Sequence, residues 1–349
     1  MGNKNITNKK KKTKKRYHTL LKSMGITLLV LLIPVLVFLF WATNKLDKLN
    51  NYEMDASKVT VNENINQDLT GYTNIAIFGV DSRENELLKN TRSDSIIIAS
   101  INNKTKEVKL VSVYRDTLAD IDDVGYRKIN SAYATGGPEK AISTLNKHLD
   151  LDISDFVTVN FSAVTNVVDA VGGITIEIEK DEITALNKNI KDGNKLQGTN
   201  SPLITEAGKQ TLDGTQALAY SRIRKTSGND FRRTQRQRNV IYAILDKAKS
   251  SGLSTINTVV DEMLPQIYTS LTPTEIFNLA KNVFSYQIVE DTGFPFEKTG
   301  ATVNRASVVL ATDLAKDVTE LHKLLFNTVD YTPSKTVQEI SKTLQTYSK

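Results

Sequence analysis

The sequence predicts an α/β fold around a mixed sheet, preceded by one membrane-spanning segment. Short β-branched runs alternate with helical patterns from about residue 73 onward, which is typical of helices packed on a sheet. An uncharged apolar stretch near the N-terminus follows a lysine-rich run, as it does in membrane anchors. With 349 residues, 40% of them hydrophobic, the chain can bury one sizeable core besides that stretch.

Positive charge is concentrated at the N-terminus. Residues 1–25 hold nine lysines and arginines and no acid, and the whole chain carries +6, so the remaining 324 residues sum to −3. The folded part is therefore mildly acidic, which argues against nucleic acid as a partner. We expect residues 1–25 to be a basic cytoplasmic leader.

Residues 26–42 (ITLLVLLIPVLVFLFWA) are the expected transmembrane anchor. Their length is close to the roughly 17 to 25 residues that cross a bilayer. Cations precede the span and Trp41 closes its other end, so the N-terminus is predicted in the cytoplasm and the rest outside, in a single-pass cell-membrane protein. A cleaved signal peptide is the alternative, but no small-x-small cleavage site follows Trp41.

The extracellular part divides into three segments. Polar, asparagine-rich residues 43–72 suit a stalk, residues 73–330 a folded domain, and residues 331–349 a C-terminal tail. Apolar runs predict strands at 74–80, 95–101, 108–113, 156–161 and 174–178. Helical patterns cover 138–149, 163–171, 213–220, 230–249, 274–284 and 313–326, and residues 181–210 resemble a loop.

Residue types exclude some chemistries. Cysteine is absent, which removes thiolate metal sites, disulfides and cysteine nucleophiles. His148 and His322 stand in polar stretches without a metal-ligand partner four residues on, and we expect both at the surface. Zinc proteases and Ser-His-Asp hydrolases are therefore poor fits.

A first cluster of charged residues lies where two expected strands meet a loop. Asp81 and Arg83 follow the strand at 74–80, and Arg92 and Asp94 precede the next. Paired carboxylates beside arginines suit a hard divalent cation and a phosphate that bridges to it. The alternative is a surface salt-bridge cluster, because Asp and Arg are common in polar loops.

A second cluster, Arg115 and Asp116, follows the strand at 108–113, and Lys128-Ile129-Asn130 comes a short loop later. Three strands that each end in such a set are expected to converge at one edge of the sheet.

A third cluster, Arg222 and Arg224, has the i, i+2 spacing that directs both guanidinium groups to one side of an extended segment. Guanidinium forks bind phosphate in bidentate fashion, so the pair suits a pyrophosphate.

The helix at 230–249 carries a fourth cluster. At about 100° per residue, Gln235 and Arg238 point away from the stripe that faces inward. That stripe contains Arg233, Arg236, Gln237, Val240 and Ile244. Buried arginines need anionic partners, and few acids lie nearby in sequence, so a bound anion is expected there.

These clusters together resemble the LytR-CpsA-Psr family of cell-wall glycopolymer ligases in Gram-positive bacteria. The shared motifs run in order from about Asn74 to Val240: GVDSR, RSD, YRDT, KIN-A-ATGG, VGGI, LDG-QALAYSRIR and DF-R--RQR. Two departures are visible, Tyr114 where the family often has proline and Arg232 where glycine is common.

The resemblance implies an α/β/α sandwich with an apolar tunnel for a polyprenyl chain and a polar mouth for pyrophosphate and Mg²⁺, or Mn²⁺ in its place. By motif match Asp81 and Asp94 would hold the metal, and Arg115, Asp116 and Asp81 would take part in the chemistry. The residues implied for phosphate or substrate binding are Arg83, Arg92, Arg222, Arg224, Arg233, Arg236 and Gln237.

The expected function is a phosphotransferase. It would attach an anionic glycopolymer, of the wall teichoic acid or capsular type, from a polyprenyl-pyrophosphate carrier to peptidoglycan. A receptor that binds lipid-linked polyanions or wall polymer without turnover is one alternative, and a transcriptional attenuator is another. The sequence leaves open which polymer is moved, the acceptor, the general base, the tunnel lining and the oligomeric state.

Overall fold

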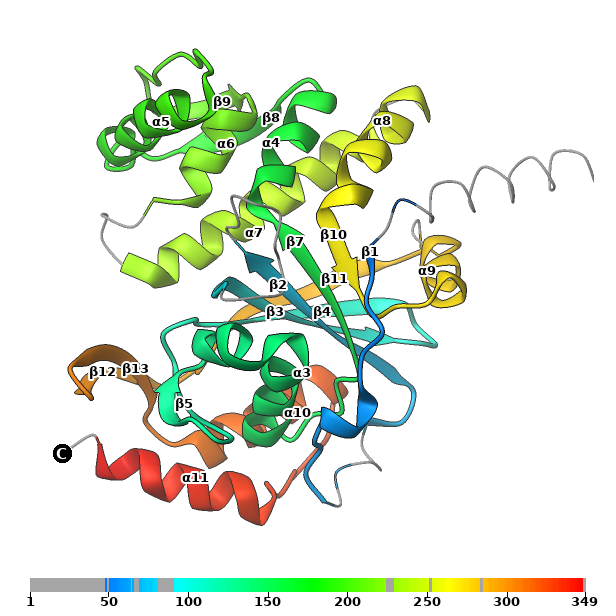
Figure 1. Ribbon diagram of the computed structural model, residues 1–349, viewed down its shortest axis with the longest axis vertical. Coiled ribbons are helices and arrows are strands. Elements are labelled where there is room, and N and C mark those ends of the chain that lie inside the picture. Colours follow the sequence, from blue (N-terminus) through cyan, green and yellow to red (C-terminus); the bar gives the residue numbers. More distant parts are fainter. Residues whose placement is uncertain are drawn as a thin grey trace, which may run out of the picture. The chain divides into compact units, whose positions relative to one another are not determined.

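A mixed seven-stranded sheet runs through the middle of the part of the chain that the structure describes (Figure 1). The structure is a computed structural model and describes residues 48, 50–63, 65, 69–80, 91–223, 229–250, 253–282 and 285–347. The strands in spatial order are β1 (Asn50–Asn51), β10 (Ile267–Thr269), β7 (Asp155–Asn160), β2 (Tyr72–Val80), β3 (Ser93–Asn102), β4 (Glu107–Val113) and β11 (Gln287–Phe294).

Strand directions decide which chain ends meet. Strands β2 and β7 are parallel, and so are β4 and β11, whereas β3 runs antiparallel to both of its neighbours. Val80 at the end of β2 therefore pairs with Ser93 at the start of β3 and with Asn160 at the end of β7. We call this side of the sheet, together with the end of β4 at Val113, the site edge.

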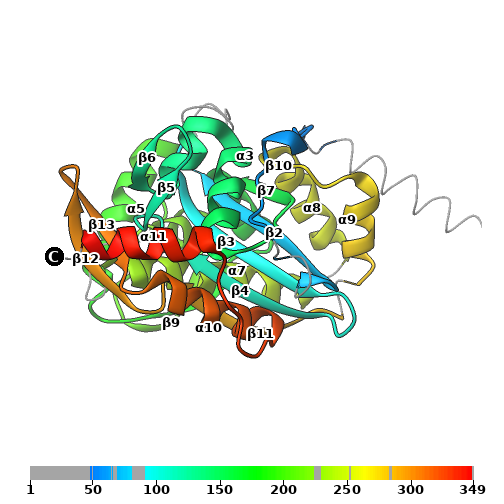
Figure 2. The ribbon, with the colours of Figure 1, turned by 90° about the horizontal axis from the view of Figure 1, so that it is seen from below.

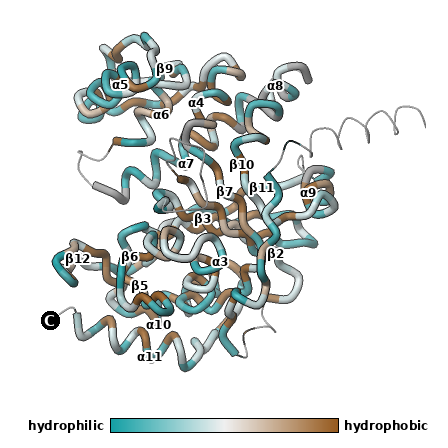
Figure 3. Tube along the Cα trace, in the orientation of Figure 1, coloured by the Kyte–Doolittle hydropathy of each residue, from teal (hydrophilic) through white to brown (hydrophobic). Residues whose placement is uncertain are grey.

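One face of the sheet is covered by helices α3 (Asn130–Leu149), α10 (Leu314–Phe326) and α11 (Lys335–Thr346). Alternate residues of the strands, such as Phe78, Ile98 and Val111, are fully buried in this layer. The sheet is the most continuous apolar part of the trace (Figure 3), and α11 lies across the layer beside α10 (Figure 2).

The second face is approached by α7 (Asn229–Lys249), which also packs on a smaller unit. That unit has its own apolar core, which includes Val168, Leu186 and Ile223. Its elements are α4 (Phe161–Ala170), β8 (Ile174–Ile178), α5 (Ile183–Gln197), β9 (Gly208–Leu212) and α6 (Gly214–Ser221). Helices α8 (Leu253–Met263) and α9 (Pro273–Ala280) follow, and α9 packs on the end of the sheet face remote from the site edge.

Two hairpins complete the fold, β5 (Leu118–Ile121) with β6 (Gly125–Lys128) and β12 (Lys298–Val303) with β13 (Ala306–Ala311). Helix α3 is kinked at Gly137, whose φ of 68° is in the left-handed region that favours glycine. Pro138 then begins a new helical turn, which agrees with the predicted start.

The predicted alternation of strands and helices is confirmed, but several local predictions are wrong. Residues 181–210, expected to form a loop, contain α5 and the start of β9, because buried Leu186 and Ile190 give an otherwise polar segment one apolar face. The expected tail contains α11, since Val337, Ile340 and Leu344 recur at helical spacing and are buried.

The expected stalk is in part packed on the domain. Strand β1 pairs with β10, and the Tyr52 hydroxyl donates to Glu139 of α3 at 2.7 Å. The two histidines expected at the surface are buried as well: His148 is 3% exposed and His322 is fully buried. Both ring nitrogens of His148 form hydrogen bonds to backbone groups, those of Asp120 and Thr144, and Nε2 of His322 bonds to the Leu149 carbonyl at 3.0 Å.

Among the residues described, no helix combines the length and the apolar character needed to cross a bilayer. The expected leader and the expected anchor at 26–42 lie outside them.

The packing of α11 gives a stability test. Leu344→Ala should lower the free energy of unfolding by roughly 2 to 5 kcal/mol, because it leaves a cavity among residues of α3, α10 and β13. Urea denaturation measures the change. Lys342→Ala, at an exposed position of the same helix, is the control and should stay within about 0.5 kcal/mol of the parent. Equal effects would contradict the buried position of α11.

Candidate functional site

A chain of alternating charges lies at the site edge. Arg115, two residues after β4, pairs through Nη1 with Oδ1 of Asp94 at the start of β3. The Arg115 Nε lies 3.9 Å from Asp116 Oδ2, and Asp116 Oδ1 lies 2.8 Å from Lys128 Nζ. All four side chains are partly exposed. The predicted convergence of the strand ends is therefore confirmed for Asp94 and Arg115.

Backbone hydrogen bonds fix the turn that carries Arg115 and Asp116. The Arg115 carbonyl accepts from the N–H of Asn130 at 3.2 Å, and the Asp116 carbonyl accepts from Val309 of β13 at 2.9 Å. Ile129 N–H donates to the Thr117 carbonyl at 2.8 Å. The charged side chains thus project from a turn attached to β6, α3 and β13, which favours a preorganised site.

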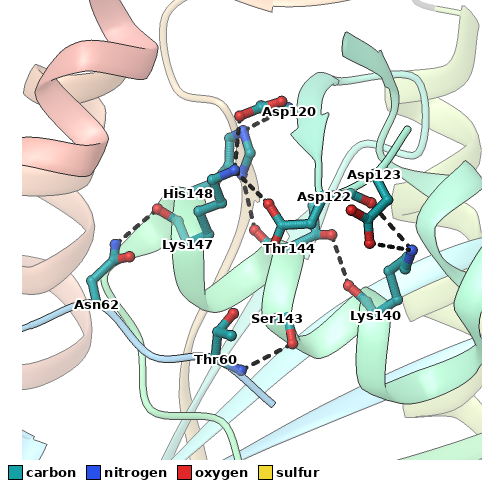
Figure 4. Close-up of polar contacts among 10 residues, drawn as sticks. All are labelled: Thr60, Asn62, Asp120, Asp122, Asp123, Lys140, Ser143, Thr144, Lys147 and His148. Carbon is teal, nitrogen blue, oxygen red and sulfur yellow. Dashed lines mark hydrogen bonds and ion pairs between the residues drawn. The ribbon is translucent and has the colours of Figure 1, made fainter. Parts of the chain in front are cut away.

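The hairpin β5–β6, which carries Lys128, is itself held on α3 (Figure 4). Lys147 Nζ lies 2.7 Å from both Asp120 Oδ2 and Asp122 Oδ1. Nε2 of His148 accepts from the backbone N–H of Asp120 at 3.0 Å, while Nδ1 donates to the Thr144 carbonyl at 2.9 Å. These two bonds require the neutral ring, and burial lowers the pKa of His148 from 6.5 to about 4.

Of the arginines on α7, Arg233 faces the site edge. Its side chain is 3% exposed, and Nη2 approaches the backbone carbonyl of Asp94 at 3.5 Å. Gln237, one turn further along the helix, is also buried. Both lie on the inward stripe that the sequence predicted.

Arg236 is also buried as predicted, but its anionic partner comes from the protein. Arg236 and Glu182 are each 2% exposed, and Nε of Arg236 donates to Oε1 of Glu182 at 2.7 Å. Nη1 donates to the carbonyl of Ile223 at 3.2 Å. The expectation of a bound anion at Arg236 is therefore wrong. It counted only acids close to Arg236 in sequence, whereas Glu182 is remote in sequence and close in space.

Arg238 was expected to point away from the protein and is instead buried, with 6% exposure. It forms an ion pair through Nε with Asp291 of β11, and Nη1 donates to the Ser112 hydroxyl of β4 at 2.8 Å. Gln235, on the same turn, is exposed as expected. The prediction failed for Arg238 because a helix between two layers has two buried sides, whereas an amphipathic stripe describes one.

The remaining predicted residues divide into two groups. Arg92 is exposed just before β3, and Arg222 is half-buried just after α6. Arg222 has φ −97° and ψ 0°, and Tyr220 and Ser221 are helical, so the extended segment expected there is not found before Arg222. Asp81, Arg83 and Arg224 lie outside the described residues.

The sequence places Lys128 a short loop after Arg115 and Asp116, and the structure confirms that Lys128 belongs to this cluster through its ion pair with Asp116. Glu182 and Asp291 were missed. They lie 54 and 53 positions from their partners Arg236 and Arg238, so no local pattern in the sequence connects them.

A sheet face beside the site edge is incompletely covered. Ile77, Leu110, Val157 and Val159 all point to the α7 side of the sheet and remain partly exposed. Part of this face is covered, since Ile97 is 4% exposed and Val157 packs against the cluster around Leu271. The part that remains, around Ile77, Leu110 and Val159, is apolar and suits an apolar ligand.

A second hollow lies between β11 and α10 and holds about 640 Å³. Lys109 lines it, but its ammonium group donates to the carbonyls of Leu324 and Leu325 at the end of α10. Since no predicted site residue among those that the structure describes lines this hollow, we do not assign it to the site.

Metal binding was predicted for Asp81 and Asp94. No group of three or more His, Cys, Asp or Glu in the described ranges could hold an ion by itself. Magnesium is usually bound by one or two carboxylates together with substrate phosphates, so Asp94 at the site edge has the donor chemistry for it, while Asp81 lies outside the described residues.

Comparisons with known proteins find relatives with this fold. The model of the LytR_cpsA_psr family matches residues 36–323. TagT of Bacillus subtilis (strain 168), named polyisoprenyl-teichoic acid–peptidoglycan teichoic acid transferase, is 32% identical over 232 residues, 65% of this chain and 69% of that protein. TagU of Enterococcus faecalis carries the same transferase name and is 33% identical over 215 residues, 61% of this chain and 64% of that protein.

Solved structures agree. One described as TagT bound to LI-WTA is 25% identical with a TM-score of 0.58, and the match covers 79% of this chain and 93% of that chain. The match to the two sequence relatives spans 69% and 64% of their own lengths.

Replacing Arg236 tests whether its role is structural. Arg236→Met should lower the free energy of unfolding by roughly 3 to 5 kcal/mol, because the buried Glu182 would lose its directly hydrogen-bonded cation and keep only Arg232 at 3.9 Å. The double variant Arg236→Met/Glu182→Leu should recover most of this loss, as urea denaturation would show. An Arg236→Met protein as stable as the parent would contradict the pairing.

Burial of His148 predicts a pH dependence of stability. Its pKa is lower in the folded protein than in the unfolded chain, so between about pH 6.5 and 4 the unfolded chain binds the extra proton. Stability should therefore fall on acidification, by about 2 kcal/mol between pH 7 and pH 5 from this group. Urea denaturation of the parent and of His148→Gln should show a smaller decrease in the variant, and identical decreases would contradict the assignment.

Proposed function

Because the chain belongs to the LytR-CpsA-Psr family, we propose that it is a phosphotransferase that moves an anionic glycopolymer from a polyprenyl-pyrophosphate carrier to peptidoglycan. The two relatives compared above, TagT and TagU, are named as transferases of teichoic acid to peptidoglycan, which makes a polymer of the teichoic acid type the first candidate. One observation carries the proposal: the cluster of alternating charges at the site edge, to which Arg233 adds a further guanidinium group, adjoins an apolar face of the sheet that is only partly covered.

The charges at the edge suit a pyrophosphate. Arg115 and Lys128 alternate there with Asp94 and Asp116, and Arg233 reaches the same edge from α7. Guanidinium groups on a fixed backbone bind phosphate oxygens with defined geometry and stabilise charge that develops on them. Under this proposal the phosphates take over interactions that the carboxylates make in the free protein.

The apolar face suits a polyprenyl chain. Ile77, Leu110 and Val159 are partly exposed on the side of the sheet that α7 approaches, and Ile241 of α7 is 39% exposed. A prenyl chain on this face would bury apolar surface worth about 25 cal/mol per Å². A polar head at the site edge and a hydrocarbon tail along the sheet match the two parts of the carrier.

The proposed reaction is displacement at phosphorus. A hydroxyl oxygen of the wall glycan forms a new bond to the sugar-proximal phosphorus, and the bridging P–O bond to the lipid phosphate breaks. Polyprenyl phosphate leaves with the bonding electron pair. Under this proposal Asp116, which Lys128 contacts at 2.8 Å, accepts the proton of the hydroxyl, with Asp81 as the alternative base. Positioning and charge stabilisation then supply most of the catalysis.

We further propose Mg²⁺, or Mn²⁺ in its place, at Asp94 and Asp81. Such an ion supplies neutralisation of the pyrophosphate charge. Asp94 is 25% exposed at the edge and is oriented there by Arg115. The location outside a membrane, with residues 1–25 inside and 26–42 as the span, is likewise proposed from the sequence.

Turnover distinguishes the proposal from its alternatives. A receptor would hold the carrier in a 1:1 complex and release nothing, and an attenuator would require the domain to lie in the cytoplasm. The test incubates the full-length protein in detergent with a lipid-pyrophosphate glycan, peptidoglycan oligomers and Mg²⁺. The transferase predicts free polyprenyl phosphate and glycan on the oligomer in equal amounts, whereas binding without release would contradict it.

Arg115→Lys should lower this turnover by about 100-fold, because one ammonium group cannot replace the bidentate fork at a charged transition state. Arg222→Ala and Arg224→Ala should weaken transfer too if the predicted phosphate clamp exists. Lys316→Ala, an exposed position of α10, is the control and should leave the rate unchanged. Parent-like turnover in Arg115→Lys would remove Arg115 from the site.

A further inference from the structure

Helix α7 is attached along two flanks by buried arginines. On one flank Arg236 pairs with Glu182 at the start of α5, and on the other Arg238 reaches Asp291 and Ser112 on the sheet. Seen along the helix axis, at about 100° per residue, the directions of Arg236 and Arg238 differ by roughly 160°. The two attachments therefore hold α7 from nearly opposite sides.

The stripe of α7 between these two flanks is polar at one end and apolar at the other. Arg233 and Gln237, nearest the site edge, are polar, and Ile241 and Ile244 continue the stripe one and two turns further on. By its angle Ile241 lies between Arg233 and Arg238, both of which contact the sheet, yet it is 39% exposed. Ile241 thus points in a direction between two residues that touch the sheet. It can remain 39% exposed only if α7 does not pack closely on the sheet at this position.

The sheet opposite is only partly covered: Ile97 is buried on this face, but three of its apolar neighbours are not. Ile77, Leu110 and Val159 share the face that carries Ser112 and Asp291, and they remain partly exposed. The guanidinium group of Arg238 binds Asp291 and Ser112 together. A planar fork at the end of a long side chain holds two partners in a defined geometry, so this contact is suited to fix the distance between the helix and the sheet.

We propose that Arg238, with Asp291, is a positioning residue that keeps α7 at the separation from the sheet that a prenyl chain requires. The inference rests on the proposed function. In it the Arg238–Asp291 pair serves to recognise the prenyl chain of the lipid and not its phosphates. Apolar residues at the two positions would fill the same volume without a fixed length, and α7 would settle toward Ile77 and Leu110. The Arg236–Glu182 pair faces the smaller unit and does not set this distance.

The test uses Arg238→Met/Asp291→Leu. Replacing both members avoids leaving a buried charge unpaired, and such replacements of buried pairs are often neutral or stabilising. Isothermal titration measures the dissociation constants of geranyl (C10) and undecaprenyl (C55) pyrophosphate in detergent. The parent should bind the longer chain more tightly. In the double variant the dissociation constant for the C55 ligand should rise by about tenfold or more, while that for the C10 ligand stays within about twofold.

The control is Arg232→Met. Arg232 is on the same helix and pairs outward with Glu179 and Asp181, so both dissociation constants should equal those of the parent. Thermal denaturation of each variant separates a loss of fold from a loss of recognition. Arg238→Lys, which keeps a cation of different shape, should fall between the parent and the double variant.

Two results would overturn the inference: a double variant that keeps the parent's preference for the longer chain, or one that loses both ligands equally. A parent that shows no preference for the longer chain would contradict the proposed function instead. The two failures are therefore distinguishable in one experiment.

Discussion

The buried charges of α7 determine how this protein is built. A guanidinium group removed from water needs a carboxylate or phosphate beside it, and breaking such a pair costs roughly 3 to 5 kcal/mol. Arg236 and Arg238 meet this requirement with Glu182 and Asp291, which belong to two different layers of the fold. The helix is thereby joined both to the smaller unit and to the sheet, and Arg233 is placed at the site edge.

The sheet supplies the second constraint. Because β3 runs antiparallel to β2 and β4, its first residues lie beside the last residues of its neighbours. Asp94 and Arg115 therefore meet although 21 positions separate them. The same pleat directs Ile77 and Leu110 toward α7 and their neighbours toward α3 and α10. The pairing register of β2, β3 and β4 thus produces both the polar site edge and the apolar face of the sheet.

Features that depend on local sequence pattern, such as the strands, could be predicted. Features that depend on contacts between residues remote in sequence, such as the burial of Arg238, could not. The runs before Asp81 and Arg115 were read as strands, and their convergence followed from residue type at strand ends. The buried position of Arg238 could not be found from one helical stripe, because Asp291 is remote in sequence and Arg238 faces a second layer. The polar helices α5 and α11 were missed because a few apolar residues at helical spacing, such as Leu344, suffice when a core is present to bury them.

One ligand is proposed to join the polar edge to the apolar face, and a crystal structure with a bound polyprenyl pyrophosphate would show whether it does. We expect the phosphates to contact Arg115 and Arg233 and the prenyl chain to run between Ile77 and Ile241. A lipid bound instead in the hollow between β11 and α10, with the site edge unoccupied, would contradict it.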